Sequence, residues 1–235
     1  MIEEERVALN NGVRIYPFSS VEELIGFVKD KKKILVAINA EKILHADDQT
    51  RNIINNNIGY CDGVGAVLAV KKHNRHVVKI AGCELWLKIV ESMQKDSSFY
   101  LVGSTQEVID ATIAKLRNEF PDINIVGYRN GFIRSEQEST ELLDDIEMKK
   151  PDIVFVAMGS PKQELLMMEM QKRHQALYQG LGGSFDVYVG KAKRAPKWWV
   201  DHNLEFAYRL FQQPARIKRQ IFLFKFVFDL IVGKI

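Results

Sequence analysis

Short apolar runs alternate with amphipathic stretches along most of this chain. The runs are rich in Val and Ile, as is typical of strands that are covered on both faces. We predict strands at residues 34–38, 98–103, 123–128, 153–157 and 176–181, a shorter one at 76–80, and a strand or hairpin at 13–18. We predict helices at 20–29, 40–55, 64–72, 84–93, 104–118, 136–149 and 160–174. This alternation predicts an α/β fold with a Rossmann-like, mostly parallel sheet and helices on both faces.

The stretch at residues 151–164 joins a buried strand directly to a helix. Gly159 permits a tight turn, Ser160 can cap the helix, and Pro161 suits its first position. Such a junction points free amide groups at any anion bound at the sheet edge. Gln163 stands where a capping box places Glu or Gln, so from the motif alone a purely capping role for Gln163 stays open.

Three other loops carry polar residues in the same kind of place. They begin at Asn39, at Asp62-Gly63 and at Gly182-Gly183, and the last of them ends at Asp186. If the sheet is parallel, these loops and the Gln163 turn meet at one edge. A carboxylate among amides and glycines suits a nucleotide diphosphate beside a single general base. Asp62 could instead only cap the next helix.

The chain changes character after residue 190. We predict an α/β catalytic domain over residues 1–190 and a C-terminal helical appendage over residues 191–235. The appendage has a basic aromatic turn at 194–199 and helices at 204–212 and 215–232. The last helix is apolar and aromatic but falls short of the ~20 residues that a membrane span needs. A helix lying in the membrane surface fits this pattern better than one packed on the domain or on another subunit.

Charge supports that division. The last 45 residues hold ten Lys/Arg and three Asp/Glu, a net charge of +7, whereas the first 190 hold 23 and 27, a net charge of −4. The basic tail therefore favours an anionic surface as partner. The N-terminal residues do not follow a signal-peptide pattern, and two cysteines without metal-ligand spacing indicate a reducing cytosol.

Several common sites are excluded by their missing motifs. The first strand is not followed by Gly-x-Gly-x-x-Gly, and the chain has no Walker A motif and no Asp-x-Asp. The five histidines form no ligand pair, so we predict no metal and no cofactor. Ser160 lacks the Gly-x-Ser-x-Gly setting of a hydrolase nucleophile.

The combination of motifs resembles the WecG/TagA/CpsF glycosyltransferase family. The matching segments are Asn39-Ala-Glu-Lys, Asp62-Gly63, Ala157-Met-Gly-Ser-Pro-Lys-Gln-Glu164, Gly182-Gly-Ser-Phe-Asp186, Lys193-Arg-Ala-Pro-Lys197 and the basic segment that ends at Arg219. The resemblance implies an inverting, metal-independent transferase. Its donor would be UDP-N-acetylmannosamine or the uronic acid of that sugar. Its acceptor would be N-acetylglucosamine on undecaprenyl diphosphate, at the cytoplasmic face of the bacterial plasma membrane.

The resemblance also assigns roles to individual residues. It implies catalytic roles for Asn39, Asp62 as the base, and Gln163. The substrate-binding set is Gly63, Lys79, Gly159, Ser160, Gly182, Gly183, Asp186, Arg209, Arg216 and Arg219. Lys79 departs from the family's usual arginine, so a charge stays there but the bidentate fork is lost.

The residues before Asn39 favour the enterobacterial common antigen branch. Ala37-Ile stands where teichoic-acid members carry Thr-Pro, and that branch uses the uronic acid donor. Two other functions stay open at this point: a non-catalytic UDP-sugar-binding protein at the membrane, and a nucleic-acid binder that uses the basic tail. The apolar last helix argues against nucleic acid, and the sequence does not decide whether the chain forms a homo-oligomer.

Overall fold

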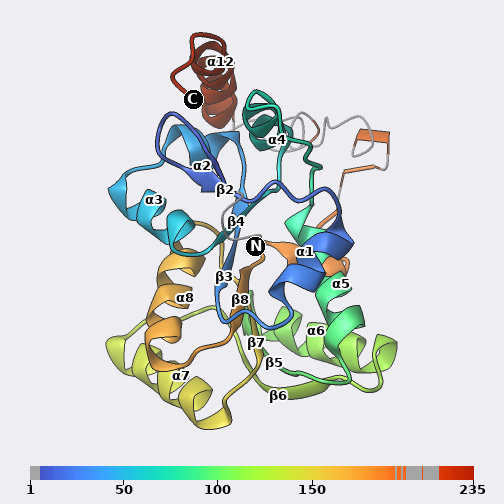
Figure 1. The fold of residues 1–235 in the computed structure, drawn as a ribbon. Helices are drawn as coiled ribbons and strands as arrows, with labels where there is room; N and C mark the ends of the chain where they lie inside the picture. The colour runs from blue at the N-terminus through green and yellow to red at the C-terminus, as the bar shows by residue number, and fades with distance from the viewer. Residues whose placement is uncertain (1–5, 194, 197, 200–207, 209–216) are drawn as a thin grey trace. The chain divides into compact units, whose positions relative to one another are not determined.

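The computed structural model describes residues 6–193, 195–196, 198–199, 208 and 217–235 (Figure 1). The chain divides into two compact units. Unit 1 contains Met1–Ser19, Ile38–Lys79 and Lys193–Ile235, and unit 2 contains Ser20–Ala37 and Ile80–Ala192. The predicted helix at 204–212 lies outside the described residues.

A six-stranded sheet in the order β4-β3-β8-β7-β5-β6 forms the centre of the fold. Its strands are β3 (Ile34–Ile38), β4 (Ile58–Cys61), β5 (Ser98–Gly103), β6 (Asn124–Arg129), β7 (Ile153–Ala157) and β8 (Leu177–Gly180). The pairings of β3 with β8, β8 with β7, β7 with β5 and β5 with β6 are all parallel. The predicted fold class, with a mostly parallel sheet and a C-terminal helix, is confirmed.

Helices cover both faces of the sheet in unit 2. They are α1 (Val21–Val28), α5 (Gly82–Met93), α6 (Gln106–Glu119), α7 (Glu136–Lys149), α8 (Lys162–Arg173) and α9 (Ser184–Tyr188). Figure 1 shows α7 and α8 on one face and α1, α5 and α6 on the other. On the second face the fully buried ring of Trp86 packs edge-on against Phe155 and Phe185, with ring centroids 5.6 Å apart in each pair. These contacts fix α5 and α9 against β7.

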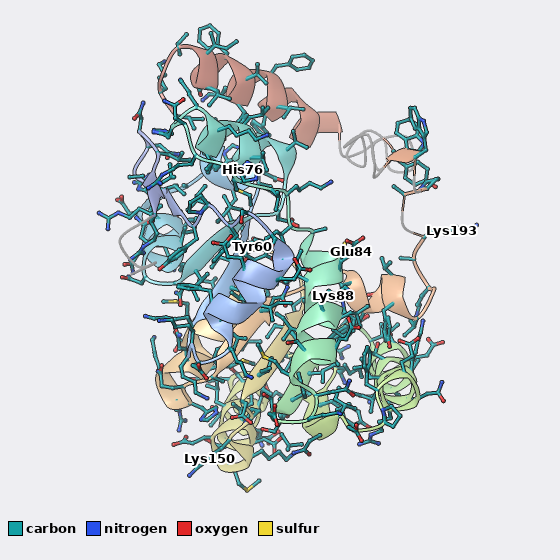
Figure 2. The ribbon with its side chains drawn as sticks, turned by 45° about the vertical axis from the view of Figure 1, so that its right-hand side comes forward. Tyr60, His76, Glu84, Lys88, Lys150 and Lys193 are labelled. Carbon is teal, nitrogen blue, oxygen red and sulfur yellow. The ribbon has the colours of Figure 1, made fainter. Side chains whose placement is uncertain are left out.

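Unit 1 contains a hairpin and four helices among its described residues. The hairpin pairs β1 (Val7–Ala8) with β2 (Arg14–Ile15), and the helices are α2 (Ala40–Leu44), α3 (Asp48–Asn55), α4 (Val64–Lys71) and α12 (Ile217–Ile231). Tyr60 of β4, labelled in Figure 2, is fully buried. Its strand thus contributes to the core.

Two predictions in unit 1 are wrong because local hydrogen bonds differ from those that the sequence pattern indicated. The helix predicted at 40–55 is divided, since the Asp47 carboxylate accepts a hydrogen bond from the Thr50 N–H at 2.7 Å and starts α3 anew. Residues 75–80 form no strand, and the Val78 N–H donates instead to the Phe18 carbonyl at 3.1 Å. Strand β4 was not predicted, because the polar tract at 55–57 and Gly59 interrupt its apolar pattern.

Candidate functional site

Asn39 and Asp62 directly follow the neighbouring strands β3 and β4, and both residues belong to unit 1. The Asp62 N–H donates to the carbonyl of Ile38, the last residue of β3, at 2.9 Å. A Cβ placed on Gly63 would lie 3.2 Å from the Asn39 Cβ, so the two turns touch. The Asn39 side-chain oxygen accepts from the Lys42 N–H at 2.8 Å and begins α2. The structure therefore brings three predicted site residues together.

Asp62 does not cap the helix that follows it. The N-cap residue of α4 is Gly63, which has no side chain. The alternative in which Asp62 is only an N-cap is therefore wrong. Cys61, the residue before it, is buried, and burial together with the Asp62 carboxylate raises the pKa of its thiol to about 12. The thiol therefore stays protonated at neutral pH.

Gln163 joins two loops of unit 2. Its side-chain oxygen accepts from the Gly159 N–H at 3.1 Å and from the Gly182 N–H at 2.9 Å. The first bond returns to the start of its own helix, as in a capping box, but the second reaches the loop after β8. Capping is therefore not its whole role. A Cβ on Gly180 would lie only 2.4 Å from the Gln163 amide nitrogen, so the glycine makes room for it.

Both loop glycines held by Gln163 adopt positive φ angles, +81° at Gly159 and +59° at Gly182. This backbone geometry is costly for other residues. Gln163 is only 6% exposed, so it contacts these loops from their buried side. Gln163 therefore sets the shape of the rim around the N-terminus of α8.

Ser104 is a site residue that the sequence did not reveal. Its hydroxyl donates to the Asp186 carboxylate at 2.9 Å, and its own φ is +53°. In the sequence, Ser104 and Glu107 fit a capping box for the helix predicted from residue 104. This prediction is wrong, because Thr105 caps α6 by accepting from the Val108 N–H. Gly103, with φ +147°, turns the chain so that Ser104 faces the first turn of α9 rather than α6. A Gly-Ser pair directly after a buried strand, repeated at 159–160, was the available signal.

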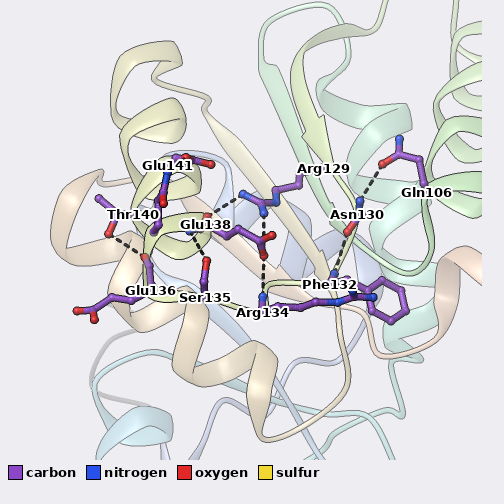
Figure 3. Close-up of polar contacts among 11 residues, drawn as sticks. Gln106, Arg129, Asn130, Phe132, Arg134, Ser135, Glu136, Glu138, Thr140 and Glu141 are labelled. Atoms are coloured by element: carbon purple, nitrogen blue, oxygen red, sulfur yellow. Dashed lines mark hydrogen bonds and ion pairs between the residues drawn. The ribbon is translucent and has the colours of Figure 1, made fainter.

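The loop after β6 contacts Ser104 through a backbone hydrogen bond, and Figure 3 shows polar contacts that hold this loop. The Gly131 N–H donates to the Ser104 carbonyl at 2.9 Å, and Asn130 donates to the Gln106 side chain at 2.8 Å. Glu138 of α7 closes the loop, since its carboxylate accepts from the Arg134 N–H at 2.7 Å. The Asp186–Ser104 pair is therefore held by β5, β6 and α9 together.

The remaining predicted site residues take varied positions. Ser160 is exposed beside Gly159, Gly183 precedes α9, and Lys79 is half-buried in the segment before α5. Arg209 and Arg216 lie outside the described residues. Arg219 belongs to α12, and its side chain also lies outside the described part.

These groups of residues follow the motifs of one sequence family. The model of the glycosyl transferase WecG/TagA/CpsF family matches residues 10–235, which is nearly the whole chain. The chain belongs to this family. It is therefore a glycosyltransferase of the WecG/TagA/CpsF type, and the predicted family is confirmed.

The site residues of this transferase fall into two groups. Asn39, Asp62 and Gly63 belong to unit 1, whereas the Gln163 loops and the Ser104–Asp186 pair belong to unit 2. Each group is organised within its own unit by the contacts described above. That both groups serve one substrate stays a prediction.

The C-terminal helix of the transferase has two different faces. Phe226 and Asp229 are buried in unit 1, and Lys225 pairs with Asp229 at 2.6 Å. The opposite side, which we call the α12 outer face, is exposed and apolar. It consists of Phe224, Val227, Phe228, Ile231 and Val232. Within the described part of the chain, no helix has the length and hydropathy to cross a membrane.

Proposed function

We propose that this glycosyltransferase is inverting and metal-independent. It moves N-acetylmannosaminuronic acid, or N-acetylmannosamine, from its UDP-sugar to N-acetylglucosamine on undecaprenyl diphosphate. The reaction serves bacterial surface polysaccharide synthesis at the cytoplasmic face of the plasma membrane. The observation that carries the proposal is the position of Asp62, a carboxylate directly after the buried strand β4 and directly before Gly63, which packs against Asn39.

Asp62 is the general base of the proposed reaction. A hydroxyl oxygen of the acceptor sugar attacks the anomeric carbon of the donor while its proton passes to the Asp62 carboxylate. The bond from the anomeric carbon to the diphosphate breaks, and UDP leaves with the electron pair. Attack from the opposite side inverts the configuration of that carbon. General-base assistance of this kind contributes about 10²–10⁴-fold to the rate.

The leaving diphosphate needs positive potential to balance its growing charge. The N-terminus of α8 is the positive end of the helix dipole, and Gln163 shapes the loop that leads into it. In the proposal, Arg216 and Arg219 add charge-assisted hydrogen bonds to the diphosphate. Asp186 contacts the nucleotide, and Ser104 fixes the orientation of its carboxylate.

Lys42 is our candidate for selecting the uronic acid donor. It lies in the first turn of α2, and its backbone N–H donates to the Asn39 side-chain oxygen. An ammonium group beside Asn39 would attract the extra carboxylate of a uronic acid sugar, whereas simple solvation of Lys42 would give no donor preference. Comparing both donors in Lys42→Met separates these roles, since only the first predicts a selective loss with the uronic acid.

The α12 outer face is our candidate for membrane contact. An exposed apolar surface on a helix that does not span the bilayer suits the lipid–water interface. The basic residues around this helix suit anionic headgroups. This arrangement would hold the enzyme where its lipid-linked acceptor lies.

A donor screen tests the proposed function. The full chain is incubated with a short-chain lipid diphosphate that carries N-acetylglucosamine, and with one UDP-sugar at a time, with and without EDTA. The proposal predicts transfer from a UDP-N-acetylmannosamine-type donor at the same rate in EDTA, with inverted anomeric configuration in the product. Transfer that stops in EDTA, or no transfer from either mannosamine donor, would contradict it.

A further inference from the structure

Helix α12 is attached to unit 1 from Phe222 to its C-terminal end. The Phe222 ring packs edge-on against His45, at the end of α2, with centroids 4.5 Å apart. Further along, the Lys72 ammonium group donates to the Leu230 carbonyl. The Asn10 side chain donates to the Gly233 carbonyl at 2.8 Å. The helix is therefore a fixed part of unit 1.

Phe226, in the middle of this attachment, reaches the first turns of α2 and α4. Its ring is 1% exposed. A Cβ placed on Gly65 would lie 3.2 Å from the Phe226 Cε1 and 2.6 Å from the Ala40 Cβ. The three residues therefore pack with no room for a further methyl group. Gly65 allows the two helices to approach closely, and Phe226 closes the gap beside them.

The candidate catalytic residues Asn39 and Asp62 lie shortly before this contact in the two segments that form it. Ala40 directly follows Asn39, and Gly65 follows Asp62 by three residues. Close packing transmits displacement, because a core position has few alternative arrangements. A shift at the Phe226 contact would therefore change the spacing between Asn39 and Asp62.

We propose that Phe226 is a positioning residue for the Asn39 and Asp62 turns. The C-terminal helix thus has a role in setting the geometry of the general base, in addition to its proposed contact with the membrane. This inference rests on the proposed function of Asp62. It predicts that loss of the Phe226 ring lowers turnover, since a misplacement of about 1 Å can cost about 100-fold in rate.

The kinetic experiment compares Phe226→Ala with two matched variants in the full chain. Phe226→Leu retains an apolar side chain, and Ile146→Ala removes a fully buried side chain from α7 in unit 2. Turnover is measured with UDP-N-acetylmannosaminuronic acid and the short-chain acceptor, and UDP affinity by calorimetry. We expect kcat of Phe226→Ala to fall about 10- to 100-fold with UDP affinity within about twofold of wild type. Phe226→Leu should keep most of the wild-type turnover. Ile146→Ala should keep the wild-type turnover although its melting temperature is close to that of Phe226→Ala.

A second readout does not depend on activity. Cys61 is buried directly before Asp62, so its labelling by iodoacetamide reports opening of that turn. With Cys83 replaced by Ser, Phe226→Ala should raise the labelling rate at least about tenfold, and Ile146→Ala should not. If Phe226→Ala does not fold, Gly65→Ala perturbs the same contact from α4 and should give the same two results.

The outcomes separate the two proposals. Unchanged labelling and unchanged turnover in Phe226→Ala would overturn the positioning role, as would an equal loss of turnover in Ile146→Ala. A wild-type protein that transfers no sugar would overturn the proposed function, and the labelling result would then still decide whether Phe226 holds the Asp62 turn.

Discussion

Replacing Gln163 by Leu tests whether one side chain holds two loops in shape. Leucine has a similar size but cannot accept the hydrogen bonds from the Gly159 and Gly182 N–H groups. Each backbone donor left without a partner in a part-buried site costs about 1–3 kcal/mol. The buried leucine side chain recovers part of this loss. We therefore expect the free energy of unfolding to fall by about 2–4 kcal/mol.

Urea unfolding followed by circular dichroism measures this loss, and calorimetry measures the affinity for UDP. Gln137→Leu is the matched control, because Gln137 is exposed on α7 and should change stability by less than about 0.5 kcal/mol. We expect UDP binding to weaken in Gln163→Leu and to stay unchanged in the control. A loss below about 0.5 kcal/mol together with unchanged UDP affinity would refute this role for Gln163.

Three further predictions follow from single contacts. Ser104→Ala should weaken UDP binding about tenfold in calorimetry by freeing the Asp186 carboxylate, and unchanged affinity would contradict this. Burial raises the pKa of Asp152, but hydrogen bonds from Ser98 outweigh it and lower the pKa. Ser98→Ala should therefore reduce stability at pH 7, and the difference from wild type should become smaller as the pH falls through the folded pKa in acid-unfolding curves. Part of the difference should remain, because the Ser98 hydroxyl also accepts from the Asp152 N–H; a difference that does not change with pH would contradict this. Phe224→Asp should reduce sedimentation with phosphatidylglycerol vesicles about 10-fold or more, and wild-type binding would exclude this surface.

The parallel sheet could be predicted because its central strands, β5, β7 and β8, are buried on both faces. Residues 153–157 are all buried, so their apolar run is uninterrupted, and the turn at Gly159 follows it as expected. Strand β4 could not be predicted in the same way. It has only four residues, one of them glycine, and a tract of three asparagines precedes it. Its position depends on pairing with β3, and the local sequence pattern holds no information about that pairing.

The sequence predicted which residues belong to the candidate site better than it predicted the contacts among them. The sequence pattern places the Asn39 and Asp62 loops at one edge of a parallel sheet, but it does not show that they are neighbours, which depends on the position of β4 beside β3. The second partner of Gln163 lies 19 residues away, so the motif alone showed only the local bond. Ser104 fits a capping pattern in sequence, and only the backbone angle at Gly103 sends its hydroxyl to Asp186.

The C-terminal helix combines two interpretations that the sequence presented as alternatives. Apolar residues occur on most sides of this helix, so the sequence pattern alone could not show which of them are buried and which are exposed. In the structure, Phe226 faces unit 1 and Phe224 is 81% exposed. Packing on the domain is therefore confirmed for one face, and contact with a membrane stays a prediction for the other.

The turnover of Asp62→Asn in the presence of EDTA tests the central claim most directly. Asparagine keeps the size of the side chain but cannot accept the proton of the acceptor hydroxyl. We predict a fall in kcat of about 10²–10⁴-fold with UDP affinity nearly unchanged. Turnover close to that of the wild-type enzyme would contradict the assignment of Asp62 as the base, and with it the proposed mechanism.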